Sequence, residues 1–304
     1  MRLAKVTKKH RLRSFFIGLI GTVIVILGVL VIYNHFQKAS RPQTIKLTAV
    51  GDSLTQGVGD PKGKGGYVNL IRKKVNHQKS NVTMTTANFG ISGETTNQIN
   101  HRVVTSKRLK RNLRQADMIT VTTGGNDLIQ FLKANISLGN NQGLKDHLDS
   151  YCVTYQKRVS RLFRSIRYLN HSAPVFVFGI YNPVYVYFPQ VSFIGTAIAH
   201  NNRITKQVID RQKNMYFIPI DKKMSDGQYQ TASARKRLRQ RAVIHDGNNQ
   251  GANAGIEGLL SNSKAEPNEY LSNTDHFHPN ETGYQIMTDL LYRDMIKHTN
   301  WLKE

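Results

Sequence analysis

Five short apolar runs separated by helical patterns are the feature of this 304-residue sequence that most constrains its fold. The runs cover residues 45–51, 82–89, 118–122, 175–179 and 215–219. Between them, residues 67–75 and 151–169 carry apolar side chains with the spacing of an amphipathic helix. Strands that alternate with helices indicate a parallel sheet covered by helices on both faces, so the chain is predicted to form an α/β domain.

Three polar motifs directly follow the first three apolar runs. They are Gly51-Asp52-Ser53-Leu54, Phe89-Gly90-Ile91-Ser92-Gly93 and Thr123-Gly124-Gly125-Asn126-Asp127. Binding and catalytic sites of parallel sheets form beyond the carboxyl ends of the strands. The three motifs are therefore expected to lie together at one edge of the sheet.

A fourth motif, near the end of the chain, supplies what a serine nucleophile requires. Asp275-His276-Phe277-His278-Pro279 lies just before a predicted helix, for which Asn280 is a suitable N-cap. A serine hydroxyl becomes a good nucleophile when an imidazole takes its proton and a carboxylate orients that imidazole. Ser53, His278 and Asp275 can fill these three roles.

The tetrahedral intermediate of such a reaction needs hydrogen-bond donors for its oxyanion. The candidate donors are the backbone N–H groups of Ser53 and Gly93 and the side-chain amide of Asn126. Asp52 and Asp127 are interpreted as structural carboxylates that accept hydrogen bonds from N–H groups of their loops. Taken singly, each motif also fits a turn, a helix cap or half of a metal site. Their joint order favours a hydrolase.

In order and spacing, four blocks resemble those of the SGNH hydrolases, also called GDSL lipases or esterases. The blocks are Gly51-Asp52-Ser53-Leu54, residues 88–95, Gly125-Asn126-Asp127 and Asp275-x-x-His278-Pro279. The resemblance covers about residues 44–298. It implies a flavodoxin-like three-layer α/β/α sandwich with a five-stranded parallel sheet. It also implies a Ser53, His278 and Asp275 triad, and an oxyanion hole from Ser53, Gly93 and Asn126, without a cofactor. Residues 57–60 and 181–183 resemble the membrane-anchored bacterial lipase/acylhydrolase branch of the family.

Residues 15–33 form an uncharged, almost wholly apolar segment long enough to cross a bilayer as a helix. The basic residues in positions 1–14 favour a cytoplasmic N-terminus, which places the rest of the chain outside the cytoplasm. The predicted organisation is a basic tail (1–14), a transmembrane anchor (15–33), a linker (34–43) and a hydrolase domain (44–304). The alternative is a signal peptide cleaved near Ala39, although its flanking residues match a cleavage site poorly.

The exported part of the chain is itself basic. Residues 1–41 hold eight Lys and Arg and no acid, so residues 42–304 keep 35 basic against 19 acidic side chains. Anionic lipid or a polyanionic wall polymer is therefore a candidate partner, whereas no nucleic-acid recognition motif accompanies the charge. The densest clusters cover residues 107–114 and 235–241. They fit either two solvated helix faces or an electrostatic docking surface.

Three further features leave alternatives open. Residues 221–274 are polar, glycine-rich and basic, and fit either a lid over the site or a disordered loop. An aromatic patch fits either core packing or contact with an acyl chain, and its members are Tyr181, Tyr185, Tyr187 and Phe188. His276, His278 and Asp275 could suggest zinc, but no third histidine or clustered carboxylate supports a metal.

The predicted activity is that of a membrane-anchored, extracytoplasmic serine hydrolase of ester bonds that works through an acyl-enzyme. One alternative is an O-acetyl esterase acting on cell-wall carbohydrate. Another is a non-catalytic basic module that tethers wall polymer to the membrane, which has no need of a complete catalytic set. The single cysteine, Cys152, excludes an intramolecular disulfide.

Overall fold

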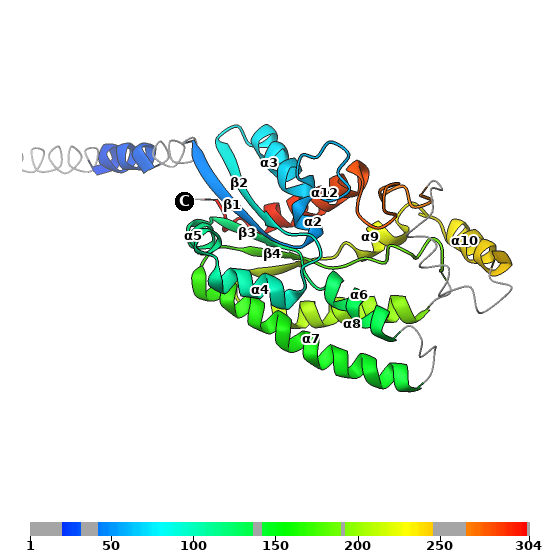
Figure 1. The fold of residues 1–304 in the computed structure, drawn as a ribbon. Helices are drawn as coiled ribbons and strands as arrows, with labels where there is room; N and C mark the ends of the chain where they lie inside the picture. The colour runs from blue at the N-terminus through cyan, green and yellow to red at the C-terminus, as the bar shows by residue number, and fades with distance from the viewer. Residues whose placement is uncertain (1–19, 32–41, 136–141, 190–191, 246–265, 303–304) are drawn as a thin grey trace, which may run out of the picture. The chain divides into compact units, whose positions relative to one another are not determined.

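The computed structural model describes residues 20–31, 42–135, 142–189, 192–245 and 266–302 (Figure 1). Residues 20–31 form a helix. No helix in these described ranges is long and apolar enough to cross a membrane. The predicted basic tail, most of the linker, and residues 15–19 and 32–33 of the predicted anchor lie outside the described residues.

A five-stranded sheet forms the centre of the domain. Its strands are β1 (Gln43–Gly51), β2 (Val82–Gly90), β3 (Met118–Val121), β4 (Val175–Phe178) and β5 (Met215–Ile218), in the order β2-β1-β3-β4-β5. β3 pairs in parallel with both β1 and β4, and β4 pairs in parallel with β5. This order is that of flavodoxin-like folds. The predicted α/β fold with a five-stranded parallel sheet is therefore confirmed.

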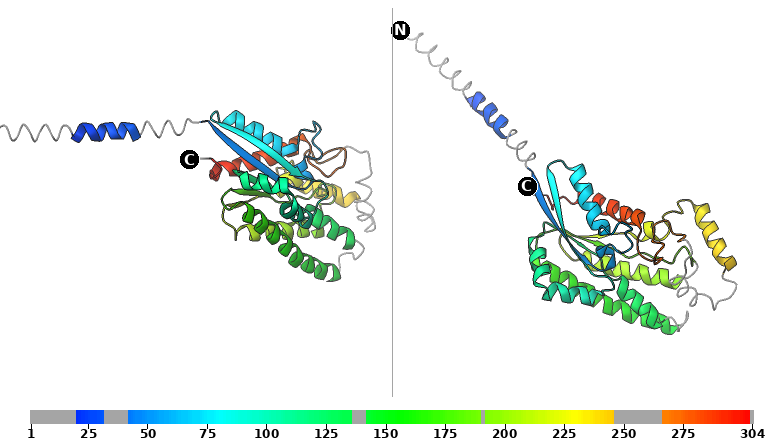
Figure 2. Two further views of the ribbon diagram at one scale, coloured as in Figure 1. Left: turned by 60° about the vertical axis from the view of Figure 1, so that its left-hand side comes forward. Right: turned by 45° about the horizontal axis from the view of Figure 1, so that its top comes forward.

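Helices cover both faces of the sheet. They are α2 (Ser53–Gln56), α3 (Gly66–Gln78), α4 (Thr96–Thr105), α5 (Lys107–Gln115), α6 (Gly125–Asn135), α7 (Gln142–Leu169), α8 (Ser192–Ile209), α9 (Asp221–Asp226), α10 (Ala232–His245) and α12 (Glu281–Lys297). Helices α3 and α12 lie on one face, and α4, α7 and α8 lie on the other (Figures 1 and 2). The three layers of the predicted sandwich are thus present.

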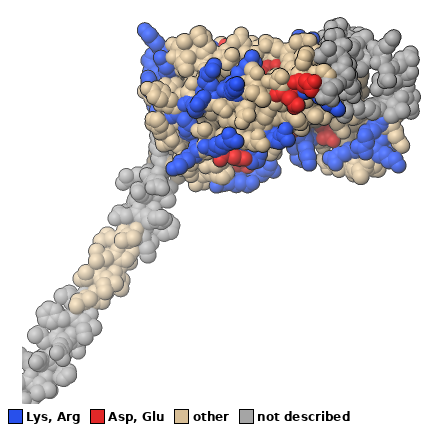
Figure 3. Space-filling model, turned by 90° about the horizontal axis from the view of Figure 1, so that it is seen from below, with Lys and Arg blue, Asp and Glu red and all other residues tan. Residues whose placement is uncertain are grey.

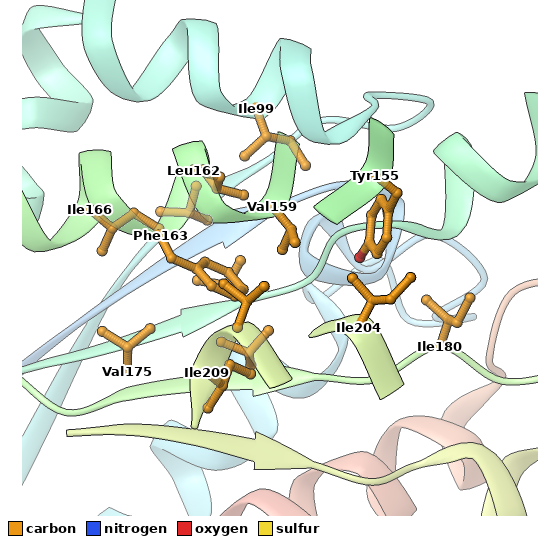
Figure 4. Close-up of a cluster of buried hydrophobic side chains, with 14 of the residues drawn as sticks. Ile99, Tyr155, Val159, Leu162, Phe163, Ile166, Val175, Ile180, Ile204 and Ile209 are labelled. Atoms are coloured by element: carbon orange, nitrogen blue, oxygen red, sulfur yellow. The ribbon is translucent and has the colours of Figure 1, made fainter. Parts of the chain in front are cut away.

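Each face of the sheet buries its own hydrophobic cluster, because successive side chains of a strand point to opposite faces. In β4, Val175 and Val177 join the cluster under α7 and α8, whereas Phe176 and Phe178 join the cluster under α3 and α12. Figure 4 shows the first cluster around Phe163. Residues 44–303 form one compact unit that contains both clusters, so this unit has what a domain needs to fold alone.

The described parts of the polar region 221–274 are ordered, unlike the disordered loop that was one alternative, and a lid over the site stays a prediction. Its first residues form α9, whose Met224 is buried in the cluster under α12, and α10 follows. Residues 246–265 lie outside the described residues. Residues 266–274 return to the domain, where Asn268 is buried and donates to the carbonyl of Met224 at 2.8 Å. Both described ends of the region therefore belong to the packed domain.

Candidate active site

Ser53 is the first residue of α2, directly beyond the carboxyl end of β1. Asp52 caps this helix, because its Oδ1 accepts hydrogen bonds from the Leu54 N–H at 3.1 Å and from Thr122 Oγ1 at 2.7 Å. Position 51 requires glycine, since a Cβ there would lie 2.2 Å from Thr122 Oγ1. The resulting tight turn presents Ser53 at the carboxyl edge of the sheet, largely buried.

The loop before α12 brings His278 and Asp275 to Ser53. His278 Nε2 lies 2.8 Å from Ser53 Oγ, and His278 Nδ1 lies 2.5 Å from Asp275 Oδ2. Asp275 Oδ1 accepts hydrogen bonds from the backbone N–H groups of Phe277 at 3.1 Å and His278 at 3.0 Å. The carboxylate therefore holds both the imidazole ring and the loop that carries it. The alcohol, imidazole and carboxylate singled out in the sequence form one hydrogen-bonded chain.

Two carboxyl groups of the site have pKa values shifted in opposite directions. Burial acts to raise the pKa of Asp275, but hydrogen bonds from the side chain and backbone of His278 outweigh it and hold the pKa below its ordinary value. Burial raises the pKa of Asp52, against the hydrogen bonds from Thr122 and Leu54. Asp275 is therefore the carboxylate suited to remain ionised beside an imidazolium.

A buried network of hydroxyl groups supports the turn at Ser53. Thr55 Oγ1 lies 2.8 Å from Thr122 Oγ1 and 3.0 Å from Tyr67 OH. Tyr67 OH in turn donates to Thr120 Oγ1 at 3.1 Å. Because Thr122 also donates to the capping carboxylate of Asp52, the network links that cap to β3 and to α3.

The two other predicted oxyanion-hole residues, Gly93 and Asn126, lie close together. Asn126 Nδ2 donates to the carbonyl of Glu94 at 2.9 Å. Gly93 has a φ of +81°, and a Cβ there would meet no atom within 4 Å, so the position borders open space. The same loop is joined to the turn at Ser53, because the Ile91 N–H donates to the carbonyl of Gly51 at 3.0 Å.

Arg102 on α4 links these motifs, although no sequence motif points to it. Its guanidinium contacts the Glu94 carboxylate at 2.6 to 2.8 Å and donates to the carbonyls of Phe89 and Gly51, both at 3.1 Å. One planar group therefore holds the ends of β1 and β2 and the loop that contains Gly93. In the sequence, Glu94 and Arg102 are eight positions apart, a spacing that does not by itself predict a contact.

Asp127 is part of the internal framework of the domain. Its Oδ2 accepts hydrogen bonds from the N–H of Thr96 at 2.7 Å and from Thr96 Oγ1 at 2.8 Å, while its Oδ1 accepts one from Arg158 at 3.0 Å. The side chain is fully buried and joins α6 to α4 and α7. These contacts agree with the structural interpretation of Asp127.

The aromatic residues predicted to contact substrate are Tyr181, Tyr185, Tyr187 and Phe188. Tyr181 packs in the cluster under α3 and α12, and its hydroxyl donates to the carbonyl of Phe277 at 2.6 Å. Burial raises the pKa of Tyr181 well above its ordinary value, so the phenol stays a donor. Tyr187 OH donates to Glu266 Oε2 at 2.8 Å. Both hydroxyls thus donate to other groups of the protein. Tyr185 and Phe188 are partly exposed. Substrate contact by the four stays a prediction.

His276 does not join the chain from Ser53 to Asp275. Its Nδ1 lies 2.8 Å from Glu266 Oε2, and both side chains are almost fully buried. Across the described ranges, no group of three or more His, Cys, Asp and Glu side chains is arranged to hold a metal ion. His276 therefore fastens the loop of His278 to the segment that begins at Glu266.

A family model for GDSL-like lipases and acylhydrolases matches residues 47–291. The chain belongs to the GDSL-like lipase/acylhydrolase family. The match covers the whole site described above, from the end of β1 to α12. As a member of the GDSL-like lipase/acylhydrolase family, the protein is an ester-hydrolysing enzyme.

Two relatives and one solved structure accompany the family assignment. The chain is 26% identical over 264 residues to the uncharacterized protein YpmR of Bacillus subtilis, covering 86% of each. It is 29% identical over 169 residues to the spore germination lipase LipC of Bacillus licheniformis, covering 54% of this chain and 75% of the relative. The lipase Lip_vut3 from a goat rumen metagenome has a similar fold, with a TM-score of 0.57 and 23% identity, over 82% of this chain and 96% of that one.

Proposed function

We propose that this GDSL family enzyme is a membrane-anchored, extracytoplasmic serine hydrolase that cleaves esters through an acyl-enzyme on Ser53. The observation that carries the proposal is the hydrogen-bonded chain from Ser53 Oγ through His278 to Asp275, with distances of 2.8 and 2.5 Å. These distances suit direct proton transfer from the hydroxyl to the imidazole.

Acylation begins when Ser53 Oγ attacks the carbonyl carbon of the ester and His278 Nε2 takes the hydroxyl proton. Asp275 orients the ring through Nδ1 and stabilises the imidazolium. Negative charge develops on the carbonyl oxygen, which the N–H groups of Ser53 and Gly93 and the amide of Asn126 bind. The C–O bond to the leaving alcohol then breaks, the alcohol takes the proton from His278, and the acyl group remains on Ser53.

Deacylation repeats these steps with water as the nucleophile. His278 takes a proton from the water as its oxygen attacks the acyl carbon. When the second tetrahedral intermediate collapses, the proton passes from His278 to Ser53 Oγ and the carboxylic acid leaves. Every proton transfer thus passes through one imidazole, and the cycle consumes one water and one ester.

The proposed membrane anchor is the apolar segment of residues 15–33. Its described part, residues 20–31, is helical and uncharged, and its apolar side chains are exposed, a surface that a bilayer would cover. Six basic residues and no acid precede residue 15, which favours a cytoplasmic N-terminus. The hydrolase domain would then act outside the cytoplasm.

Labelling with a fluorophosphonate tests the proposed nucleophile. The probe should modify Ser53, identified by mass spectrometry of the labelled peptide, and denatured protein should not react. Labelling of another serine, with Ser53 unmodified, would contradict the proposal.

The proposed topology is tested separately, by adding protease to intact cells from which the wall has been removed. Cleavage of the domain from outside is expected, and protection until lysis would reject the extracytoplasmic location.

A series of p-nitrophenyl esters of increasing acyl length tests the substrate class. The resemblance to the lipase LipC supports turnover of long acyl chains. Preference confined to acetate would instead favour an O-acetyl esterase, because each methylene that a pocket accepts or rejects changes the specificity constant by about tenfold or more. Absence of turnover on every ester would favour the non-catalytic tethering module.

A further inference from the structure

We propose that one face of the domain binds the anionic headgroups of a phospholipid membrane. This basic face comprises Lys107, Arg108, Lys110, Arg111 and Arg114 on α5, Lys157, Arg161 and Arg164 on α7, and Arg211 just after α8. The proposal rests in part on the membrane anchor proposed above. It is independent of the catalytic chemistry, because none of these residues belongs to the active site.

Within the described part of the chain, no acidic side chain neutralises the charge of the basic face. Among the described residues, no ion pair joins any of its nine side chains to an acid. α5 contains five cations and no acid, and it buries Leu109 and Leu113 on its opposite side. Figure 3 shows the side of the molecule below α4 and α7, where blue Lys and Arg patches far outnumber red Asp and Glu. Such a surface attracts a polyanion.

Two neighbouring grooves give the basic face its shape. One, of about 460 Å³, lies between α4, α5 and α7 and contains Lys110 and Arg114. The other, of about 470 Å³, lies between α7 and α8 and contains Lys157 and Arg211. Arg161 and Arg164 line both grooves. Guanidinium groups bind phosphate oxygens in pairs, so two neighbouring grooves with shared arginines suit several phosphate headgroups side by side.

Exposed apolar side chains within the first groove favour a membrane over a soluble polyanion. Val104 and Tyr168 line that groove beside its cations, with exposures of 46% and 78%. A soluble phosphate polymer offers no apolar layer for such side chains. Aromatic and aliphatic side chains beside cations are typical of surfaces that sit at the headgroup level of a bilayer.

Chain connectivity also favours the membrane. The Lys46 N–H donates to Asp117 Oδ2 at 2.8 Å, which places the start of β1 beside the end of α5. α7 and α8 likewise end where β4 and β5 begin, so the basic face lies toward the amino edge of the sheet. Only residues 34–42 separate the proposed anchor from β1, a tether that spans about 30 Å at most. That edge therefore cannot move far from the bilayer, whereas Ser53 lies at the opposite edge.

Flotation of the fragment 42–304 with lipid vesicles tests the proposal without the anchor. Vesicles of phosphatidylcholine alone are compared with vesicles that contain one quarter phosphatidylglycerol, at 50 and 500 mM salt. Cooperative urea unfolding of each variant verifies that the fragment is folded, and ester turnover is measured separately. The test variant is Arg161→Glu with Arg164→Glu. The matched control is Lys73→Glu with Arg293→Glu, which makes the same charge change at exposed positions on α3 and α12.

Wild type should bind the anionic vesicles at 50 mM salt and leave them at 500 mM, because salt screens exposed charges. The test variant should bind at least about tenfold more weakly, and the control within about threefold of wild type. If both variants bound the anionic vesicles equally weakly, vesicle binding would depend on the net charge of the protein and not on the basic face. That result would overturn the proposal. Absence of binding to anionic vesicles would overturn it as well. Binding of soluble polyphosphate without vesicle binding would assign the grooves to a polymer instead. Absence of ester turnover in wild type would contradict the proposed function but would not change what the vesicle experiment says about the basic face.

Discussion

The guanidinium of Arg102 donates to the carbonyl of Gly51 at 3.1 Å, two residues before Ser53. The same group contacts Glu94, whose carbonyl accepts a hydrogen bond from Asn126. One side chain thus connects the strand that presents the nucleophile with the loop of Gly93 and with Asn126, two of the three predicted oxyanion-hole donors. Because Arg102 is largely buried, bulk water competes little for the groups that make these contacts.

Arg102→Lys should lower kcat at least about tenfold and leave KM within about threefold. An ammonium cannot reach three separate acceptors, so Ser53 and the oxyanion donors lose their alignment, which matters most in the transition state. Steady-state kinetics on a p-nitrophenyl ester provide the measurement. Arg203→Lys, at an exposed position on α8, is the matched control. Unchanged kcat in a folded variant would show that Arg102 does not position the site.

Tyr181→Phe should lower kcat several-fold without changing KM, and lower the free energy of unfolding by about 1 kcal/mol. The change keeps the ring but removes the donor to the Phe277 carbonyl, next to His278. Urea unfolding and kinetics measure the two effects, with Tyr168→Phe, at an exposed position on α7, as the control. A raised KM with unchanged kcat would instead assign Tyr181 to substrate contact.

Gly59→Ala should lower both stability and kcat. A Cβ at this position would lie 2.6 Å from the carbonyl oxygen of Pro279 and 2.9 Å from His278 Cβ, on a backbone with φ of +85°. Clash and strain together are expected to cost about 1 to 3 kcal/mol. Gly63→Ala separates the two causes, because its φ is +58° but no atom lies within 4 Å of the added Cβ. Equal stability and activity of the two variants would contradict the packing of residue 59 against His278.

Asp52→Asn should make stability less sensitive to pH. The folded-state pKa of Asp52 is raised by burial above the ordinary value near 3.9, so its contribution to stability is fully present below about pH 4 and is lost as pH rises through the raised value. Asparagine cannot ionise, and its oxygen still accepts from Leu54. The free energy of unfolding of the variant minus that of wild type should therefore increase from pH 4 upward. Urea titrations at several pH values test this, and a difference that falls with pH would contradict it.

The strands were predictable because the buried strands of a parallel sheet are apolar on both sides and end at polar motifs. β1, for example, runs directly into Gly51-Asp52-Ser53. Parallel pairing then requires the other strand-end motifs to share that edge, which is why residues 88–95 and Asn126 could be placed together before any distance was known.

Other parts of the site could not be predicted, because they depend on contacts between segments rather than on a pattern within one. Arg102 acts on backbone carbonyls, which every residue has. Tyr187, Glu266 and His276 meet only in the folded chain. α9 has six residues, too few to reveal a helical period, and α10 carries one buried apolar residue, Leu238, among its described side chains.

The role of Ser53 as the nucleophile is tested by the specificity constants of wild type and Ser53→Ala on a short p-nitrophenyl ester. Ser80→Ala, at an exposed position between α3 and β2, is the matched control. Ser53→Ala should lose at least about 10³-fold of the activity, because the acyl-enzyme forms on Ser53 Oγ, while Ser80→Ala should retain it. Equal turnover by wild type and Ser53→Ala would show that Ser53 is not the nucleophile.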